Sequence, residues 1–378
     1  MHLKQLHIIN FKSHAEVALQ FTDGINCFIG ANGSGKTNLL DAIHYLSVCK
    51  SYFNAIDSQN IKHDEPFFVI QGMFVKNDED EDVYCGLKRN QRKQFKRNQK
   101  EYDRLAEHIG LFPAIVITPT DSSLITDGSE ERRRLIDTII SQQDKKYLEN
   151  LMSYNKVLSH RNALLKDFSR KNSYDKDTID VWDVQLDQYG SYVYTARKNF
   201  IHDLLPILTQ FYDFISNERE HIQLVYESKL HETSIYDLLK ETIKKDLALE
   251  YTSVGVHKDD LEFLMNDHSI KKYGSQGQQK SFLLALKLAL FEMVKANCGF
   301  KPMLLLDDIF DKLDNGRVER LLELVSNNNF GQIFITHTDN EKLKFILAKL
   351  EIPVNYFSVE TDGVKSLTLE TPIVHERE

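Results

Sequence analysis

The sequence predicts an α/β fold in which one head is built from two separated stretches of chain. Strand-like and helix-like periods alternate over the first 50 residues. A helical period then dominates from about residue 130 to about residue 245, and mixed α/β signals return after Tyr251. We therefore expect a split head, residues 1–125 and 249–378, with a helical insertion over residues 126–248 between its halves.

The first half opens with two strand-like segments and a helix. Apolar residues predict one strand near residues 3–9, and a second strand at residues 24–29 runs straight into the glycine-rich segment 30–37. From Leu39 to Leu46 the apolar residues recur at helical spacing, so a helix follows the glycines. The order strand, glycine loop, helix is the context in which such loops bind nucleotide phosphates.

Residues 67–117 carry a strand-rich pattern. The segments FFVIQGMFV, DVYCGLK and AIVIT are separated by an acidic tip at 78–82 and a basic run at 88–104. Strands joined by short polar segments predict a small antiparallel β subdomain with hairpins.

The insertion and the second half of the head are read in the same way. Helices are expected from about residue 130, with a polar turn near 171–177 and a further helix at about 181–200. No heptad pattern is sustained, so a long coiled coil is not expected. A helix near 276–295, a strand at 303–306, a helix near 317–325 and a strand at 332–336 complete the head.

Residues 30–37, GANGSGKT, have the full pattern of an ATP phosphate-binding loop. The glycines let backbone N–H groups point at phosphate oxygens, Lys36 would reach the β- and γ-phosphates, and the Thr37 hydroxyl would bind Mg²⁺. The candidate ATP-binding residues are Gly30, Ala31, Asn32, Gly33, Ser34, Gly35, Lys36, Thr37 and Asn38.

The segment 303–308, MLLLDD, is an apolar strand that ends in two acids. Asp307 would hold Mg²⁺ together with Thr37, and Asp308 would orient or deprotonate the attacking water. Asp308 and Lys36 are therefore the candidate catalytic residues. A buried strand with an ordinary polar end is the alternative, which the upstream phosphate loop makes less favoured.

A polar turn, GSQGQQ at residues 274–279, opens the long apolar helix. Ser275, Gly277 and Gln278 at a helix N-terminus would suit an anion, although serine is also a common N-cap. The order of phosphate loop, Ser-x-Gly-Gln signature and acidic strand resembles the ABC/SMC-type P-loop ATPase heads.

That resemblance implies a site shared between two subunits. In such heads the signature of one subunit contacts the γ-phosphate bound by the other, so an ATP-dependent homodimer is expected. Asp311 and Asp314 stand where these heads carry their D-loop, and His337 stands near their switch histidine. A structural role for His337 is the alternative.

Over nearly its whole length the chain is similar to the bacterial RecF family of recombination-repair proteins. The stretches that carry the similarity are 10–12, 30–47, 50–52, 117–119, 131–134, 154–158, 161–162, 255–260, 275–280 and 304–308. The sequence departs from the family pattern at Lys258 and Lys280, where arginine is commoner. Residues 119–121 also offer no glutamine for a Q-loop.

The resemblance implies a protein that binds DNA at gaps or single/double-strand junctions when ATP is bound. It would dimerise on ATP and help RecR and RecO proteins load recombinase during repair and replication restart. Slow ATP hydrolysis would time its release. The implied cofactors are ATP and Mg²⁺.

Charge permits DNA binding only at a local surface. The net charge of −9 makes general coating of DNA unfavourable, but residues 88–104 hold eight basic and two acidic residues. An exposed hairpin whose charges only protect an edge strand is the alternative. The candidate DNA contacts are Lys88, Arg89, Arg92, Lys93, Lys96 and Arg97. Arg132, Arg133 and Arg134 form a second cluster, or pair with Glu130 and Glu131.

Other functional classes share some of these motifs. The ATPase subunit of a membrane transporter has the same ATP motifs but no such insertion, and an SMC-like nuclease would need a further acidic cluster. The four cysteines lack CxxC spacing and the N-terminus lacks a signal-peptide core, so a cytoplasmic protein without a membrane segment is expected.

Overall fold

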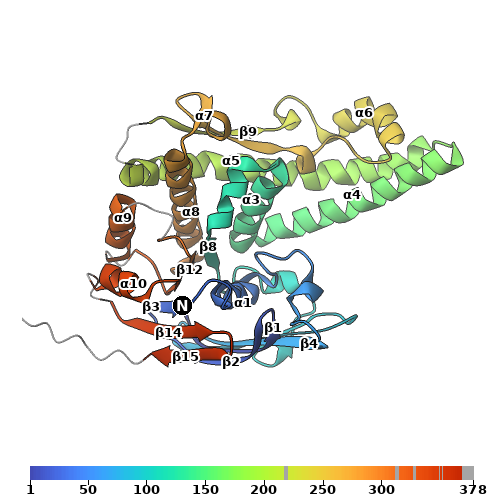
Figure 1. The fold of residues 1–378 in the computed structure, drawn as a ribbon. Helices are drawn as coiled ribbons and strands as arrows, with labels where there is room; N and C mark the ends of the chain where they lie inside the picture. Colours follow the sequence, from blue (N-terminus) through green and yellow to red (C-terminus); the bar gives the residue numbers. More distant parts are fainter. Residues whose placement is uncertain (217–219, 311–314, 327–328, 349, 351, 368–378) are drawn as a thin grey trace, which may run out of the picture. The chain divides into compact units, whose positions relative to one another are not determined.

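The computed structural model describes residues 1–367 apart from 217–219, 311–314, 327–328, 349 and 351. The chain forms two compact units (Figure 1). The first combines Met1–Pro119 with the chain from Cys298 onward, and the second is Thr120–Asn297. One unit is thus built from two separated stretches, as expected for a split head. The finer division at residues 125/126 and 248/249 stays a prediction.

The first unit contains a six-stranded sheet in the order β15-β14-β3-β13-β12-β8. All neighbours are parallel except β15, which pairs antiparallel with β14. Every residue of β3, β13, β12 and β8 is buried, which explains why these segments have apolar runs instead of alternation. The bounds are β3 Ile25–Ile29, β8 Ala114–Ile117, β12 Met303–Asp307, β13 Ile333–His337, β14 Val354–Glu360 and β15 Gly363–Leu367.

The placement of AIVIT in the antiparallel subdomain was wrong. Strand β8 pairs in parallel with β12, with Ile117 opposite Leu306, and so belongs to the mixed sheet. All four of its residues are buried, unlike the alternating burial of the true antiparallel strands. Spacing along the chain favoured the nearer sheet, whereas burial of both faces selects the parallel one.

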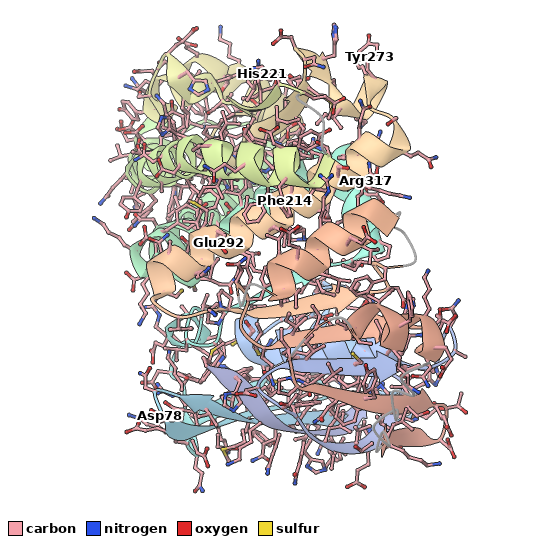
Figure 2. All side chains as sticks on the ribbon, turned by 90° about the vertical axis from the view of Figure 1, so that its left-hand side faces the viewer. Asp78, Phe214, His221, Tyr273, Glu292 and Arg317 are labelled. Carbon is pink, nitrogen blue, oxygen red and sulfur yellow. The ribbon has the colours of Figure 1, made fainter. Side chains whose placement is uncertain are left out.

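The antiparallel subdomain is a second six-stranded sheet, in the order β2-β1-β4-β5-β6-β7. The expected β4–β5 hairpin turns at Asn77 and Asp78, which both have positive φ (52° and 63°), the backbone that a tight hairpin needs. Asp78 is labelled in Figure 2. Strand β2 was missed by the sequence reading. The bounds are β1 His2–Phe11, β2 His14–Gln20, β4 Phe67–Lys76, β5 Glu79–Lys88, β6 Gln94–Arg97 and β7 Lys100–Glu101.

Helix α1 (Lys36–Val48) packs against strands of both sheets. Its buried residues Leu39, Ile43 and Leu46 join side chains of the two sheets in one hydrophobic core. The core therefore fixes the start of α1, and with it the glycine loop. The other helices of this unit are η1 Asp57–Asn60, η2 Leu105–Glu107, α9 Asn315–Ser326 and α10 Asn340–Leu347.

The second unit is mainly helical. Its long helices α4 (Lys145–Lys171) and α5 (Lys176–Ser216) lie side by side (Figure 1). Asp144 caps the start of α4 by accepting the Tyr147 N–H, and Asn172 ends it in the left-handed region. Shorter helices complete the unit: η3 Pro119–Ser122, α2 Ser123–Thr126, α3 Ser129–Gln143, η4 Lys229–His231, α6 Ile235–Leu249, η5 Val256–Lys258, α7 Ile270–Tyr273 and α8 Gln276–Cys298.

The sequence predicted a helical insertion, but the insertion also contains a strand. Strand β9 (Ile222–Glu227) pairs antiparallel with β10 (Asp260–Met265), which also pairs with β11 (His268–Ser269). A strand of six residues is too short to show a clear alternation. Its partner β10 lies more than thirty residues later, so no nearby hairpin indicates it either.

Buried polar contacts connect residues from several of the family-like stretches in this unit. Arg161 on α4 contacts Asp183 on α5 and Asp246 on α6, at 2.6 and 2.8 Å. The Tyr154 hydroxyl lies 2.8 Å from Nδ1 of His257. Burial lowers the pKa of His257 to about 4, so this ring is neutral at physiological pH. These residues hold the helices together.

Candidate nucleotide site

The glycine loop is shaped by contacts that a side chain would break. A Cβ on Gly30 would lie 2.2 Å from the Val359 carbonyl oxygen, so only glycine fits beside β14. Gly35 has φ of +104°, in the left-handed region, and comes directly before the first residue of α1. The sequence therefore folds into a tight loop that ends at a helix N-terminus, a geometry suited to phosphate.

Lys36 lies inside this loop. Its side chain is buried, and Nζ donates to the carbonyl oxygens of Gly30 (2.9 Å) and Ala31 (3.0 Å). Two neutral carbonyls only partly compensate a buried ammonium group, so a phosphate oxygen would be a stronger partner for it.

Thr37 and Asp307 meet although they are 270 residues apart in the chain. The Thr37 Oγ1 lies 2.9 and 3.1 Å from the two carboxylate oxygens of Asp307. The Thr336 hydroxyl donates to Asp307 Oδ1 at 2.7 Å. Burial raises the pKa of the Asp307 carboxyl, against the effect of these hydrogen bonds, so a cation would suit this position.

The donor set fits Mg²⁺. A hydroxyl and a carboxylate are the oxygen ligands that phosphate-bound Mg²⁺ takes from protein, with phosphate and water completing its shell. No group of three or more His, Cys, Asp or Glu residues that could hold a metal by itself occurs among the described residues. Thr37 and Asp307 would supply two oxygen ligands of such an ion.

Asp308 follows directly and has an unusual backbone. Its φ is +45°, in the left-handed region, and its N–H donates to the Thr336 hydroxyl at 2.9 Å. Oδ1 of Asp308 is buried and has no hydrogen-bond partner among the residues that the structure describes. An unsatisfied buried carboxylate oxygen beside the Thr37–Asp307 pair is suited to accept a proton or hydrogen bond from water.

The β1–β2 turn adds contacts that the sequence reading missed. His14 Nε2 lies 3.0 Å from the carbonyl oxygen of Gly35, and the Asn38 amide donates to Ser13 Oγ at 2.7 Å. Burial lowers the pKa of His14, so the neutral ring donates to that carbonyl. The family-like stretch 10–12 ends at Lys12, the first residue of this turn, and gave no indication of the contacts of Ser13 and His14.

Asp41 on α1 brings two of the family-like stretches together. It is paired with Lys12 at 2.6 Å, and it accepts hydrogen bonds from the Ser51 hydroxyl and the Tyr52 N–H. The stretches 10–12 and 50–52 therefore meet at one carboxylate in the middle of α1.

His337 lies at the end of β13, next to the loop. Its ring is fully buried, and its carbonyl oxygen accepts the Gly30 N–H at 3.3 Å. A switch role for the ring stays a prediction. The expected D-loop residues Asp311 and Asp314 lie outside the described residues.

The signature turn belongs to the second unit. Ser275 and Gln278 cap helix α8 reciprocally: Ser275 Oγ accepts the Gln278 N–H at 3.2 Å, and the Gln278 side chain accepts the Ser275 N–H at 2.7 Å. Gln278 also donates to Glu220, a contact that the sequence did not indicate. Tyr273, two residues earlier and labelled in Figure 2, is 73% exposed. The cap is thus present, and anion binding by Ser275, Gly277 and Gln278 stays a prediction.

The six candidate DNA contacts divide into two groups. Lys93 is occupied internally by Asp57 (2.8 Å) and the Cys49 carbonyl oxygen (2.6 Å), and Arg97 is paired with Glu81. Lys96 is half-buried against the Tyr84 ring, at 5.5 Å. The exposed members are Lys88, Arg89 and Arg92, of which Arg89 donates through Nε to the Glu65 carbonyl oxygen at 2.9 Å.

The second basic cluster is also mostly paired. Arg132 contacts Asp260 at 2.7 Å, Arg133 donates to the Asp259 carbonyl, and Arg134 pairs with Glu131. Of the two partners expected from the sequence, Glu130 and Glu131, only Glu131 is found in these contacts.

In the part of the chain that the structure describes, we find no helix that is both long and apolar enough to cross a bilayer.

Comparison with known proteins identifies close relatives. The family model for the RecF/RecN/SMC N terminal domain matches residues 2–354. The DNA replication and repair protein RecF of Flavobacterium johnsoniae is 50% identical over 347 residues, which cover 92% of this chain and 97% of that protein. RecF of Bacteroides fragilis is 48% identical over 368 residues, covering 97% and 99% of the two chains.

Solved structures agree. The ATP complex of the recombination mediator protein RecF of the RecFOR pathway is 31% identical, with a TM-score of 0.88 over 97% of this chain and 98% of that one. The Smc head domain of Pyrococcus furiosus, at 16% identity, has a TM-score of 0.57 and covers 97% and 96%, which shows a related fold.

Proposed function

The chain belongs to the RecF family of DNA replication and repair proteins, within the RecF/RecN/SMC N-terminal domain family of ATPases, and from that premise we propose an ATP-switched role on DNA. In this proposal the protein binds gapped or junction duplex DNA when it holds ATP. It then assists RecR- and RecO-type partners in loading recombinase, and it acts in the cytoplasm. The contact of Thr37 with Asp307, across 270 residues, is the observation that carries the ATP half.

Four residues of the candidate site have a task in this proposal. Lys36 leaves the carbonyls of Gly30 and Ala31 for the phosphates, and Thr37 with Asp307 holds Mg²⁺. When bound, Mg²⁺ neutralises the charge on the phosphate oxygens. Asp308 orients the attacking water through Oδ1, which has no hydrogen-bond partner among the described residues. Hydrolysis is slow and serves as a timer.

The site is completed by a second copy of the chain. The phosphate loop and Asp307 lie in one compact unit and the signature turn in the other. The start of α8 is exposed at Ser275, so a partner's γ-phosphate can reach it. ATP then joins two subunits, and dimerisation is the output that DNA binding requires.

The first test replaces Lys36 by Arg. The buried ammonium lies between two carbonyls of the loop, and a planar guanidinium needs a wider space and a forked set of partners. We expect ATP hydrolysis to fall to background and ATP-dependent DNA binding to be lost, measured by phosphate release and gel shift. Hydrolysis at the wild-type rate would refute the assignment of the loop.

DNA binding is tested with a gapped duplex in gel shifts with and without ATP. We expect a shift only with ATP, and we expect it to weaken when the exposed residues Lys88, Arg89 and Arg92 are all changed to Ala. The logarithm of the affinity falls linearly with the logarithm of the salt concentration, and each lost phosphate contact should make this slope about 0.9 less steep.

The matched control keeps the charge, with Lys88→Arg, Arg89→Lys and Arg92→Lys in one chain. Wild-type affinity and salt slope are expected for it. An alanine variant that binds as tightly as wild type would remove this hairpin from the DNA surface. A wild-type protein that never shifts the duplex at low salt would overturn the proposed function itself.

A further inference from the structure

The chain passes between its two units at only two places, and one of them lies beside the nucleotide site. It enters the second unit after Pro119 and returns after Asn297. Strand β8 ends at Ile117, which is opposite Leu306, one residue before Asp307. The connection over residues 118–121 therefore begins next to the strand that carries the two acids.

Two residues after Pro119, the chain is tied to helix α8. The Asp121 carboxylate lies 2.8 Å from Nζ of Lys287, and the two side chains are 4% and 2% exposed. The neighbours of Lys287 along α8 are buried apolar residues, among them Leu286 and Leu288. A buried lysine is costly unless it is paired, so this ion pair is a fixed attachment and differs from an exposed surface pair.

Helix α8 carries the signature at its other end. Ser275 caps the helix, and Lys287 follows twelve residues later, so about 18 Å of helix separates the cap from the ion pair. A helix with an almost fully buried middle transmits a rotation along its length. An attachment at Lys287 therefore sets the direction in which the signature turn points.

We propose that Asp121 and Lys287 are positioning residues that couple nucleotide binding to the signature helix. This inference rests on the proposed function, because it needs a signature that meets ATP in trans. Through its ion pair with Lys287, Asp121 ties the chain that follows β8 to α8, so that a shift of this connection moves the signature turn with it.

The test compares Asp121→Asn with a matched control, Asp183→Asn. Asp183 also pairs through a buried contact in the second unit, with Arg161 at 2.6 Å, but it belongs to α5 and not to the connection or to α8. Asp121→Asn removes a carboxylate from Lys287, and Asp183→Asn removes one of the two carboxylates that pair with Arg161, so both variants should lower the melting temperature. Only a coupling role predicts a difference in ATP-induced dimerisation.

The expected result separates ATP binding from dimerisation. The ATP affinity of dilute protein should change less than about twofold in both variants. In sedimentation at saturating ATP, the protein concentration for half-dimerisation should rise roughly tenfold for Asp121→Asn, a typical size for coupling between sites. It should stay at the wild-type value for Asp183→Asn, and for Lys287→Arg, which keeps the charge pair.

Several outcomes would overturn the inference. One is wild-type dimerisation by Asp121→Asn, and another is an equal loss in Asp183→Asn, which would mean general destabilisation. Should Asp121→Asn fail to fold, the double variant Asp121→Leu with Lys287→Met removes both charges, and the same rise is expected for it. If wild-type protein binds ATP but never dimerises, the proposed function fails together with the coupling. If wild-type protein dimerises and Asp121→Asn does so equally well, only the coupling fails.

Discussion

Changing Asp308 to Asn is expected to stop ATP hydrolysis while leaving the ATP-bound dimer intact. The backbone of this residue is in the left-handed region, at φ of +45°, which asparagine tolerates as well as aspartate does. The loop should therefore keep its shape. What is lost is the basicity of the buried oxygen Oδ1, which has no hydrogen-bond partner in the described part of the chain.

The hydrolysis rate should fall roughly a hundred- to ten-thousand-fold, the usual contribution of a general base. Single-turnover phosphate release measures this rate, and sedimentation should show dimers that persist for much longer than in wild type. Asp78→Asn is a suitable control, because Asp78 also has positive φ (63°) but lies exposed in the β4–β5 turn (Figure 2). A variant at 308 that hydrolyses at the wild-type rate would assign the water to another residue.

Local patterns were enough to predict the order of strand, glycine loop and helix around residues 30–37. A strand, eight residues with three glycines and a helix follow one another without a break, so the loop, Lys36 and the start of α1 needed no distant partner. The acids of β12 were found in the same way, since an apolar run that ends in two aspartates is a feature of a single segment.

Features that depend on distant partners were not predictable. Strand β8 was assigned to the wrong sheet, because its partner β12 lies almost two hundred residues later in the chain. Strand β9 was overlooked because β10 supplies its only pairing within the described residues. Contacts of the loop with Ser13 and His14 depend on a turn whose position is fixed by sheet pairing.

The sequence of a basic segment also does not show which of its side chains are exposed and which are paired within the protein. Lys93 and Arg97 were grouped with exposed basic residues, yet Asp57 and Glu81 hold them in internal pairs. Neutralising Lys93 would remove a partly buried ammonium from three contacts, to Tyr45, Cys49 and Asp57, so it would test folding more than DNA binding. The hairpin test is therefore restricted to Lys88, Arg89 and Arg92.

Changing Ser275 to Arg is expected to block ATP-induced dimerisation without preventing ATP binding. The phosphate loop and Asp307 belong to the first unit and the signature turn to the second, so the residues proposed to bind ATP within one subunit are not altered by the change. A large side chain at the exposed start of α8 would occupy the position that a partner's γ-phosphate needs. ATP-dependent binding to gapped duplex should be lost with the dimer.

Loss of the helix cap must be separated from loss of the interface, because removing an N-cap hydroxyl costs about 1 kcal/mol of stability. Ser234→Arg provides the control, since Ser234 caps α6 by accepting the Asp237 N–H at 3.0 Å. Both variants should be destabilised by similar amounts, but only Ser275→Arg should stay monomeric with ATP in sedimentation. Because the signature meets the nucleotide only across two subunits in this proposal, dimers of Ser275→Arg would be incompatible with it.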